Sequence, residues 1–170
     1  MDASDGDTKG ASNNERLLAA ARTDNEELIL KVLGEEGTFD INCQDGLGNT
    51  PLHNAVINGS TDVLEHILEH EGCDVDPINR IEGATPLHLA VQLGHPGLRK
   101  HVVESLLEAG ADTSIKDKNG FIVLDLILSD DTEMRTLIRR SQAQSSISKD
   151  DIASGTYFFS LSLFHSFFVT

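Results

Sequence analysis

The residues best suited to metal binding are two histidines in an acidic stretch. His66 and His70 lie four positions apart on a helix predicted over residues 62–70, with Glu65 and Glu69 beside them. This spacing can place two imidazoles on one metal ion. Two ligands on one helix, without the His-Glu-x-x-His arrangement, are nevertheless too few for a structural or catalytic zinc site. We therefore predict a solvated polar helix face and no bound metal.

Cysteine chemistry is also limited. Cys43 and Cys73 fall on different predicted loops without a Cys-x-x-Cys pair, which argues against a zinc site and a disulfide framework and favours a reducing compartment. As a nucleophile Cys43 would need a neighbouring base, and the sequence places none beside it. Phosphate-loop, Gly-x-Ser-x-Gly and dinucleotide-binding motifs are missing from the sequence. We predict that the protein is not an enzyme and needs no cofactor.

Two further histidines belong to a phrase that occurs twice. Residues 48–56 read Gly-Asn-Thr-Pro-Leu-His-Asn-Ala-Val, and residues 83–91 read Gly-Ala-Thr-Pro-Leu-His-Leu-Ala-Val, 35 positions later. The Thr can cap a helix, and the Pro suits the first helical position because no N–H is needed there. Leu, Ala and Val at i, i+3 and i+4 then form a narrow apolar stripe. The motif residues are Thr50, Pro51, Leu52, His53, Ala55, Gly59, Thr85, Pro86, Leu87, His88, Ala90 and Gly94.

Thr-Pro-Leu-His-x-Ala at this period resembles the ankyrin repeat, a β-turn followed by two antiparallel helices. The resemblance implies an all-α solenoid of four helix-turn-helix repeats with β-turn fingers, in which degenerate first and last repeats act as caps. It also implies that His53 and His88 bond neighbouring Thr and backbone groups and take no part in catalysis. In its overall pattern the chain resembles the small uncharacterised fungal ankyrin-repeat proteins, and that resemblance supplies no partner.

The repeat domain is predicted over residues 14–140, in repeats at about 14–47, 48–82, 83–119 and 120–140. The first repeat lacks the repeated phrase but keeps its apolar stripe; Ser12 or Asn14 caps its first helix, and Ser12 followed by Glu15 fits a capping box. The second finger carries about one extra residue. The third repeat is four residues longer than a standard one, with residues 96–100 as the insertion, so its outer helix is expected to start late or to bulge.

The flanking segments differ in composition from the repeats. Residues 1–13 form an acidic arm, predicted to be disordered and unlike a signal or transit peptide. Residues 141–155 are rich in Ser, Gln and Asp without a period, which predicts a solvated linker. Residues 156–170 are uncharged and hold five of the seven Phe, yet they are too few to span a bilayer comfortably. Three readings stay open for this tail: a sticky interaction segment, a partial membrane anchor, or a gene-model artefact such as read-through, which we favour.

Net charge narrows the choice of partner. The 170 residues carry a formal charge of −15 and have a pI near 4.6. Nucleic acids and anionic membranes attract clustered Lys and Arg, so both are poor partners for this chain. A basic protein is the better electrostatic match. We expect a monomer in the cytoplasm or the nucleus, with no small-molecule ligand.

The predicted function is non-enzymatic protein–protein interaction through a concave groove lined by finger tips and inner helices, as the resemblance implies. The predicted partner-binding residues are Leu47, Asn49, Ile57, Asn58, Arg80, Ile81, Glu82, Gln92, Leu93, Lys118 and Phe121. Ile57 and Leu93 are expected to form its apolar centre, inside a rim of charged finger tips. Two alternatives stay open: an acidic chaperone or escort for a basic client, for example a ribosomal protein, and a regulatory subunit or inhibitor of an enzyme.

Overall fold

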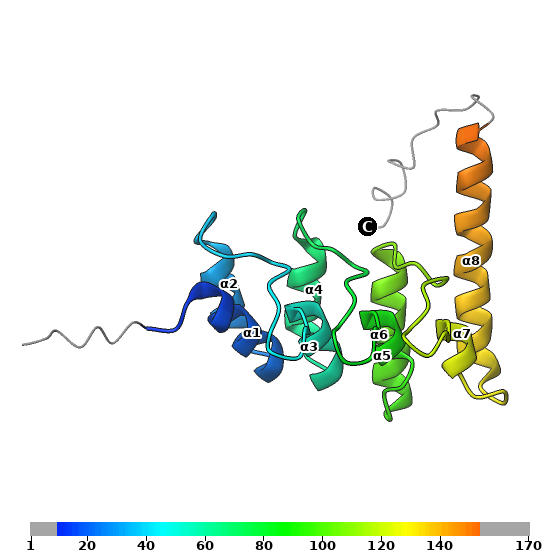
Figure 1. The fold of residues 1–170 in the computed structure, drawn as a ribbon, viewed down its shortest axis with the longest axis horizontal. Coiled ribbons are helices and arrows are strands. Elements are labelled where there is room, and N and C mark those ends of the chain that lie inside the picture. Colours follow the sequence, from blue (N-terminus) through cyan, green and yellow to red (C-terminus); the bar gives the residue numbers. More distant parts are fainter. Residues whose placement is uncertain (1–9, 154–170) are drawn as a thin grey trace, which may run out of the picture.

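The computed structural model describes residues 10–153, which form a row of stacked helix pairs (Figure 1). The helices are α1 (Asn13–Thr23), α2 (Glu26–Leu33), α3 (Pro51–Asn58), α4 (Thr61–Glu69), α5 (Pro86–Ala90), α6 (Pro96–Glu108), α7 (Val123–Leu126) and α8 (Thr132–Ala153). The inner helices α1, α3, α5 and α7 contact one another in turn, as do the outer helices α2, α4 and α6. These residues contain no β-strand, so the predicted all-α repeat solenoid is confirmed.

The repeated phrase begins the central inner helices in the way its residues predict. Thr50 has an extended backbone, Pro51 is the first residue of α3, and the Thr50 hydroxyl accepts a hydrogen bond from the third helical N–H. At the start of α5, Thr85 is likewise extended and Pro86 is the first helical residue. At the start of α1, Ser12 and Glu15 exchange hydrogen bonds between side chain and backbone. The predicted capping box is therefore confirmed.

Small residues at the centre of the inner helices let neighbouring helices approach closely. Ala55 is 1% exposed and Ala90 is 0% exposed, where α3 and α5 contact the helices on either side. Leu52 and Val56 fill the space beside Ala55, and each outer helix adds its own apolar stripe. A continuous core therefore runs along the stack, as expected when each repeat buries its apolar face against the next.

The prediction that the third outer helix starts late or bulges is wrong. Helix α4 begins at Thr61 and has 9 residues, whereas α6 begins at Pro96, the matching position, and has 13. Pro suits this first position, and the Leu98 N–H is capped by the side chain of His95. The four extra residues therefore lengthen the helix by about one turn.

Most of the predicted linker over residues 141–155 is helical where the structure describes it, because α8 runs unbroken to Ala153. Its first half is anchored by the buried Met134 and Ile138. No Gly or Pro occurs between Thr132 and Ala153, and extending an existing helix costs little compared with starting one. The polar composition of this segment, which has no apolar period, therefore did not reveal the helix.

The remaining flanking segments lie outside the described residues. This applies to positions 1–9 of the predicted arm, to the last two positions of the predicted linker and to the apolar tail 156–170. Among the helices that the structure does describe, none combines the length and the apolar character needed to cross a bilayer.

Candidate functional site: fingers and inner helices

The two histidines of the repeated phrase are buried bridges between repeats. His53 is fully buried, and its Nδ1 accepts a hydrogen bond from the Thr50 N–H at 3.2 Å. Since Nδ1 is an acceptor, the proton resides on Nε2, which donates to the Ala84 carbonyl at 3.0 Å. Burial lowers the pKa of His53, in spite of that bond to the carbonyl. A neutral ring locked between two repeats positions the next finger.

His88 repeats this arrangement one unit later. Its Nδ1 accepts from the Thr85 N–H at 3.2 Å, and its Nε2 donates to the Phe121 carbonyl at 3.2 Å. The side chain is fully buried. The structural role that the resemblance implied for both histidines is therefore confirmed by their hydrogen bonds.

The other candidates for chemistry do not converge. His66 Nε2 lies 3.1 Å from a Glu26 carboxylate oxygen, whereas the ring of His70 packs edge-on against Phe39 with 5.8 Å between ring centroids. In the part of the chain that the structure describes, no three metal-ligating side chains come together. Burial is the main cause that raises the pKa of both Cys43 and Cys73 to about 11, which leaves both thiols protonated at neutral pH and weakly nucleophilic.

Each finger is a tight turn closed by one carboxylate or amide side chain. In the first finger, Asp45 Oδ1 accepts hydrogen bonds from the Leu47 and Asn49 N–H groups at 2.9 and 3.0 Å. Asp117 plays the same part in the third finger, and Asn79 in the second. The Asn79 N–H reaches a carbonyl five residues ahead instead of four, which confirms the extra residue predicted there.

Neighbouring fingers are joined through their backbones. The Arg80 N–H donates to the Leu47 carbonyl at 3.2 Å, and the Lys118 N–H donates to the Glu82 carbonyl at 3.0 Å. The basic side chains reach the same preceding fingers. Arg80 and Lys118, predicted as partner-binding residues, are exposed but also hold the fingers in register.

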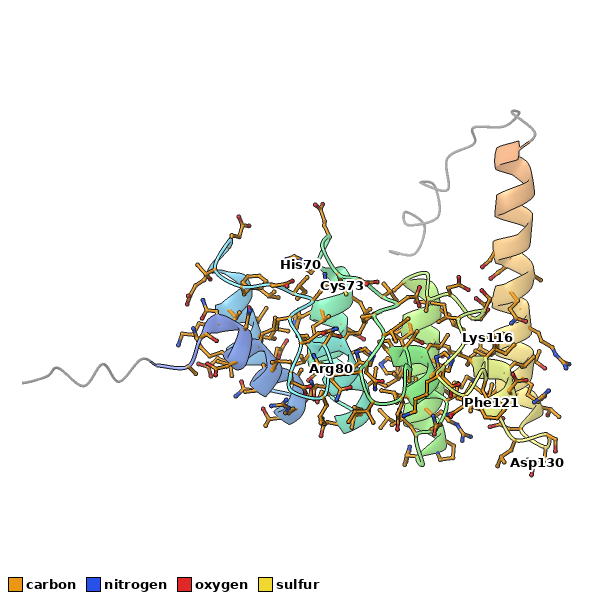
Figure 2. The ribbon with its side chains drawn as sticks, in the orientation of Figure 1. His70, Cys73, Arg80, Lys116, Phe121 and Asp130 are labelled. Carbon is orange, nitrogen blue, oxygen red and sulfur yellow. The ribbon has the colours of Figure 1, made fainter. Side chains whose placement is uncertain are left out.

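Most of the predicted partner-binding residues are exposed. Large apolar side chains stand on the finger tips and at the end of α3, with exposed fractions of 52% for Leu47, 48% for Ile57, 50% for Ile81 and 48% for Phe121. Figure 2 labels Phe121 near the last repeat. Their polar neighbours Asn58, Arg80, Glu82, Gln92 and Lys118 are exposed as well. Each finger therefore presents at least one large apolar side chain to the solvent, and the second finger presents two, since Ile78 is 52% exposed.

Two predicted residues do not belong to an exposed surface. Asn49 is only 7% exposed, because the next finger covers it and its Oδ1 accepts a hydrogen bond from Asn79. Leu93 is half-buried and packs against the core. Leu93 therefore does not share an exposed apolar surface with Ile57 in the way that was predicted.

A partly buried polar network near the first finger escaped the sequence analysis. Arg22, from α1, donates to Asp45 at 2.8 Å and to the Asn54 side chain at 3.2 Å. Burial alone would raise the pKa of Asp45, but hydrogen bonds from Asn49, Asn54 and Arg22 outweigh it and hold the pKa below its usual range. The recurring Asp three positions before a Gly, at Asp45 and Asp117, was the available signal.

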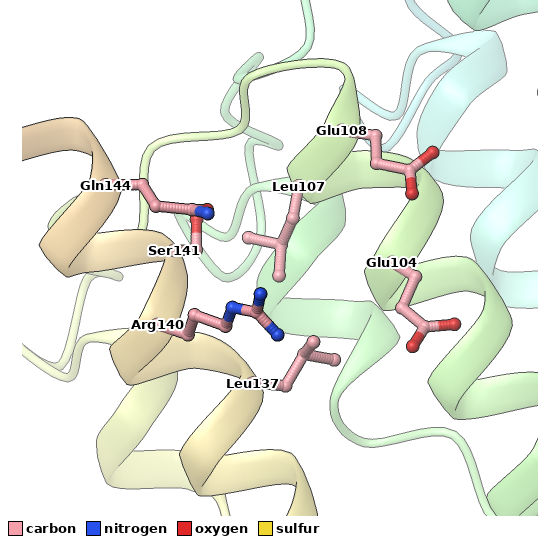
Figure 3. A pocket seen from close by; sticks show the side chains of 7 residues that line it. All are labelled: Glu104, Leu107, Glu108, Leu137, Arg140, Ser141 and Gln144. Carbon is pink, nitrogen blue, oxygen red and sulfur yellow. The ribbon is translucent and has the colours of Figure 1, made fainter. Parts of the chain in front are cut away.

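A surface depression lies near the C-terminal end of the stack. It has a volume of about 250 Å³ and opens between α6 and α8. Leu107 and Leu137 line its apolar part, and Figure 3 shows Arg140 between them, with Glu104 and Glu108 across the opening. This side-chain set holds one cation and two carboxylates but no nucleophile paired with a base, so it has no catalytic arrangement.

The stacked helix pairs, the buried Thr–His caps and the projecting fingers define an ankyrin-repeat solenoid. The family profile described as Ankyrin repeats (3 copies) matches residues 17–117. The chain therefore belongs to the ankyrin-repeat family, whose members are in general protein–protein interaction modules and not enzymes.

Individual relatives share the same repeats. The chain is 35% identical to the ankyrin repeat-containing protein YGL242C of Saccharomyces cerevisiae over 136 residues, which cover 74% of this chain and 75% of that protein. It is 40% identical over 85 residues to the palmitoyltransferase Hip14 of Drosophila melanogaster, covering 50% of this chain but 13% of that enzyme. The SMC5-SMC6 complex localization factor protein 1 of Bos taurus is 33% identical over 124 residues, covering 71% and 11%. The last two similarities therefore concern a small part of much longer proteins.

Proposed function

We propose that the protein binds another protein, as a monomer and without catalysis, through the concave surface formed by the fingers and the inner helices. The observation that carries this proposal is the row of half-exposed apolar side chains on successive fingers, Leu47, Ile81 and Phe121, close to exposed polar groups. Apolar contacts of this kind supply most of the affinity in protein interfaces, whereas rim charges mainly set the association rate.

The outer helices give the contrast that supports this choice of surface. Exposed positions on α2 and α4 carry mainly acidic side chains, as at Glu26, Glu27, Asp62, Glu65 and Glu69. Such a face keeps the protein soluble and repels like-charged neighbours. We therefore assign recognition to the fingers and inner helices, and solubility to the outer helices.

The test compares two exposed apolar surfaces in the full chain. Changing Ile57 and Ile81 together to Ser should weaken capture of cellular partners by about tenfold or more, because each substitution removes one apolar contact from the centre of the proposed interface. The matched control is Leu30→Ser on the outer helix α2, where the side chain is 49% exposed. Quantitative affinity capture with mass spectrometry gives the readout, and loss of partners in the control alone would contradict the proposal.

A basic client is the second candidate, and the net charge of −15 is the observation that favours it. Long-range attraction would steer a Lys-rich protein to an acidic escort, and such binding weakens steeply with salt. A regulatory subunit or inhibitor would instead bind an enzyme through apolar finger contacts that resist salt. Capture at 50 and at 500 mM salt, conditions about tenfold apart in ionic strength, separates these cases. Either role fits a protein of the cytoplasm or the nucleus.

A further inference from the structure

Equivalent glycines in the three fingers have different surroundings. A side-chain Cβ built at Gly48 would lie 2.6 Å from the Arg80 nitrogen, and one built at Gly83 would lie 3.0 Å from the Lys118 nitrogen. At Gly120 no atom of the described residues lies within 4 Å of the added Cβ. The first two glycines are therefore covered by the next finger, whereas the third faces open space.

The two occupied joints use the same groups. Arg80 donates its backbone N–H to the Leu47 carbonyl, and its side chain donates to the adjacent Gly46 carbonyl at 3.5 Å. At the next joint Lys118 donates to the carbonyls of Glu82 and Ile81 in the same way. Each joint thus consists of two adjacent carbonyls and a glycine that together receive one basic residue.

The third finger has the two carbonyls and the glycine of such a joint, but no basic residue of the described chain occupies them. The equivalent carbonyls belong to Lys118 and Asn119, and no donor among the described residues reaches them. Phe121 is 48% exposed, whereas the residues at its position in the earlier fingers, Asn49 and Ala84, are 7% and 3% exposed. Among the described residues, the end of the finger row therefore leaves two carbonyl acceptors and an aromatic side chain uncovered.

We propose that this open edge binds a tight turn of another protein that places a Lys or Arg where Arg80 and Lys118 stand in the occupied joints. The backbone N–H of that residue would donate to the Asn119 carbonyl and its side chain to the Lys118 carbonyl, while its stem covers Gly120. Such backbone pairing would add one more turn to the row of hydrogen-bonded fingers, much as an added strand pairs with the edge of a sheet. The inference rests on the proposed function, since it names the partner chemistry for one end of the finger row.

The sequence itself points to a different protein as the source of the turn. A second copy of this chain would offer its first finger, but that finger has Gly46 at the position of the basic residue. The segment 154–170 contains no Lys or Arg, so it cannot supply the residue either. A basic turn also matches the net charge of −15.

The test uses the full chain and a cyclised peptide with the sequence of residues 115–121, the turn that already occupies the preceding joint. Titration followed by amide chemical shifts should show saturable changes at Gly120 and Phe121. A peptide of the same composition with Asp117 and Lys118 exchanged should bind about fivefold more weakly or worse. Equal binding of the two peptides, or shifts confined to the acidic outer helices, would show that only net charge is being sensed and would overturn the proposal.

Variants of the protein locate the edge. Phe121→Ser should weaken the peptide by about threefold or more, since it removes the apolar contact but keeps the backbone acceptors. Leu30→Ser, at a side chain with nearly the same exposed fraction on the outer helix α2, should leave peptide binding unchanged. A Phe121 variant that binds as well as the wild type would also overturn the proposal. Failure of the proposed groove is read separately, because it would leave partner capture unchanged in the Ile57 and Ile81 variant, whatever the result with this peptide.

Discussion

The central repeats and the terminal repeats of this protein hold their neighbours by different means. In the centre, His53 and His88 are fully buried and each donates a hydrogen bond to a backbone carbonyl of the following finger. At the C-terminal end, α6 is joined to the last repeat by two ion pairs, Arg99–Asp131 at 2.7 Å and Lys100–Glu133 at 2.6 Å. Buried imidazole rings join the central repeats, and partly solvated ion pairs join the last two repeats.

This difference follows from access to water. A carbonyl between two packed repeats must find a protein donor, because leaving it unpaired costs about 1–3 kcal/mol. At the end of the array, water can satisfy the same groups, so an exposed ion pair that contributes little is sufficient. The Thr-Pro-Leu-His phrase is therefore needed only where a repeat has two neighbours.

The largest expected effect comes from removing a central bridge. His53→Ala should lower the free energy of unfolding by about 2–3 kcal/mol, because it leaves the Ala84 carbonyl and the Thr50 N–H without partners. Urea denaturation followed by circular dichroism measures the change. A loss below about 0.5 kcal/mol would mean that water replaces the ring and that the centre is no different from the end.

Close packing of the inner helices should be nearly as sensitive. Ala55→Leu adds three carbon atoms at a position that is 1% exposed and should cost about 2 kcal/mol by overpacking. Ala19→Leu, at an exposed position of α1, is the matched control and should change stability by less than about 0.5 kcal/mol. Equal melting temperatures for the two variants would refute the packing.

Acid should weaken the central joints selectively. Because burial lowers the pKa of His53, the unfolded chain binds a proton below about pH 6.5 that the folded chain does not. This contribution to stability is complete above that pH and is lost as the pH falls toward the folded-state pKa, with a slope of at most about 1.4 kcal/mol per pH unit. The wild type should therefore lose more stability than His53→Gln between pH 7 and 5, while their difference stays constant from pH 7 to 8. If the free energies of unfolding of the wild type and of His53→Gln changed in parallel from pH 5 to 8, the buried neutral ring of His53 would be contradicted.

The smallest effects are expected at the C-terminal end. Lys100→Gln breaks an exposed ion pair and should cost less than about 0.5 kcal/mol, and Arg99→Gln, whose guanidinium is less exposed, should cost about 1 kcal/mol. Both losses should shrink in 1 M salt, where the screening length is about 3 Å. Thermal melts at low and high salt provide the comparison, and losses as large as that of His53→Ala would erase the distinction between centre and end.

Features set by neighbouring residues in the chain could be predicted from the sequence. The helix starts at Ser12, Thr50 and Thr85 depend on a cap and a following residue within the same turn, so the local pattern was sufficient. The burial of Ala55 and Ala90 followed from the helical stripe in the same way.

Features set by contacts between repeats could not be predicted. Asn49 is buried because the second finger, with its extra residue, folds over it, and nothing near Asn49 in the sequence records that contact. The insertion at 96–100 was recognised, but its length alone did not show whether it would bulge or continue the helix. The continuation of α8 to Ala153 was missed because a polar helix has no apolar period once it leaves the core.

The hydrogen bonds between repeats also set how the chain can fold. His53 reaches a carbonyl 31 positions ahead and His88 one 33 positions ahead, and among the described residues the longest reach of a hydrogen bond is 40 positions, from Glu26 to His66. Every such contact therefore joins adjacent repeats, which gives a low contact order and favours rapid folding. Because none of the hydrogen bonds among residues 10–153 needs the far end of the chain, the first three repeats can acquire their native joints while the last is still being synthesised.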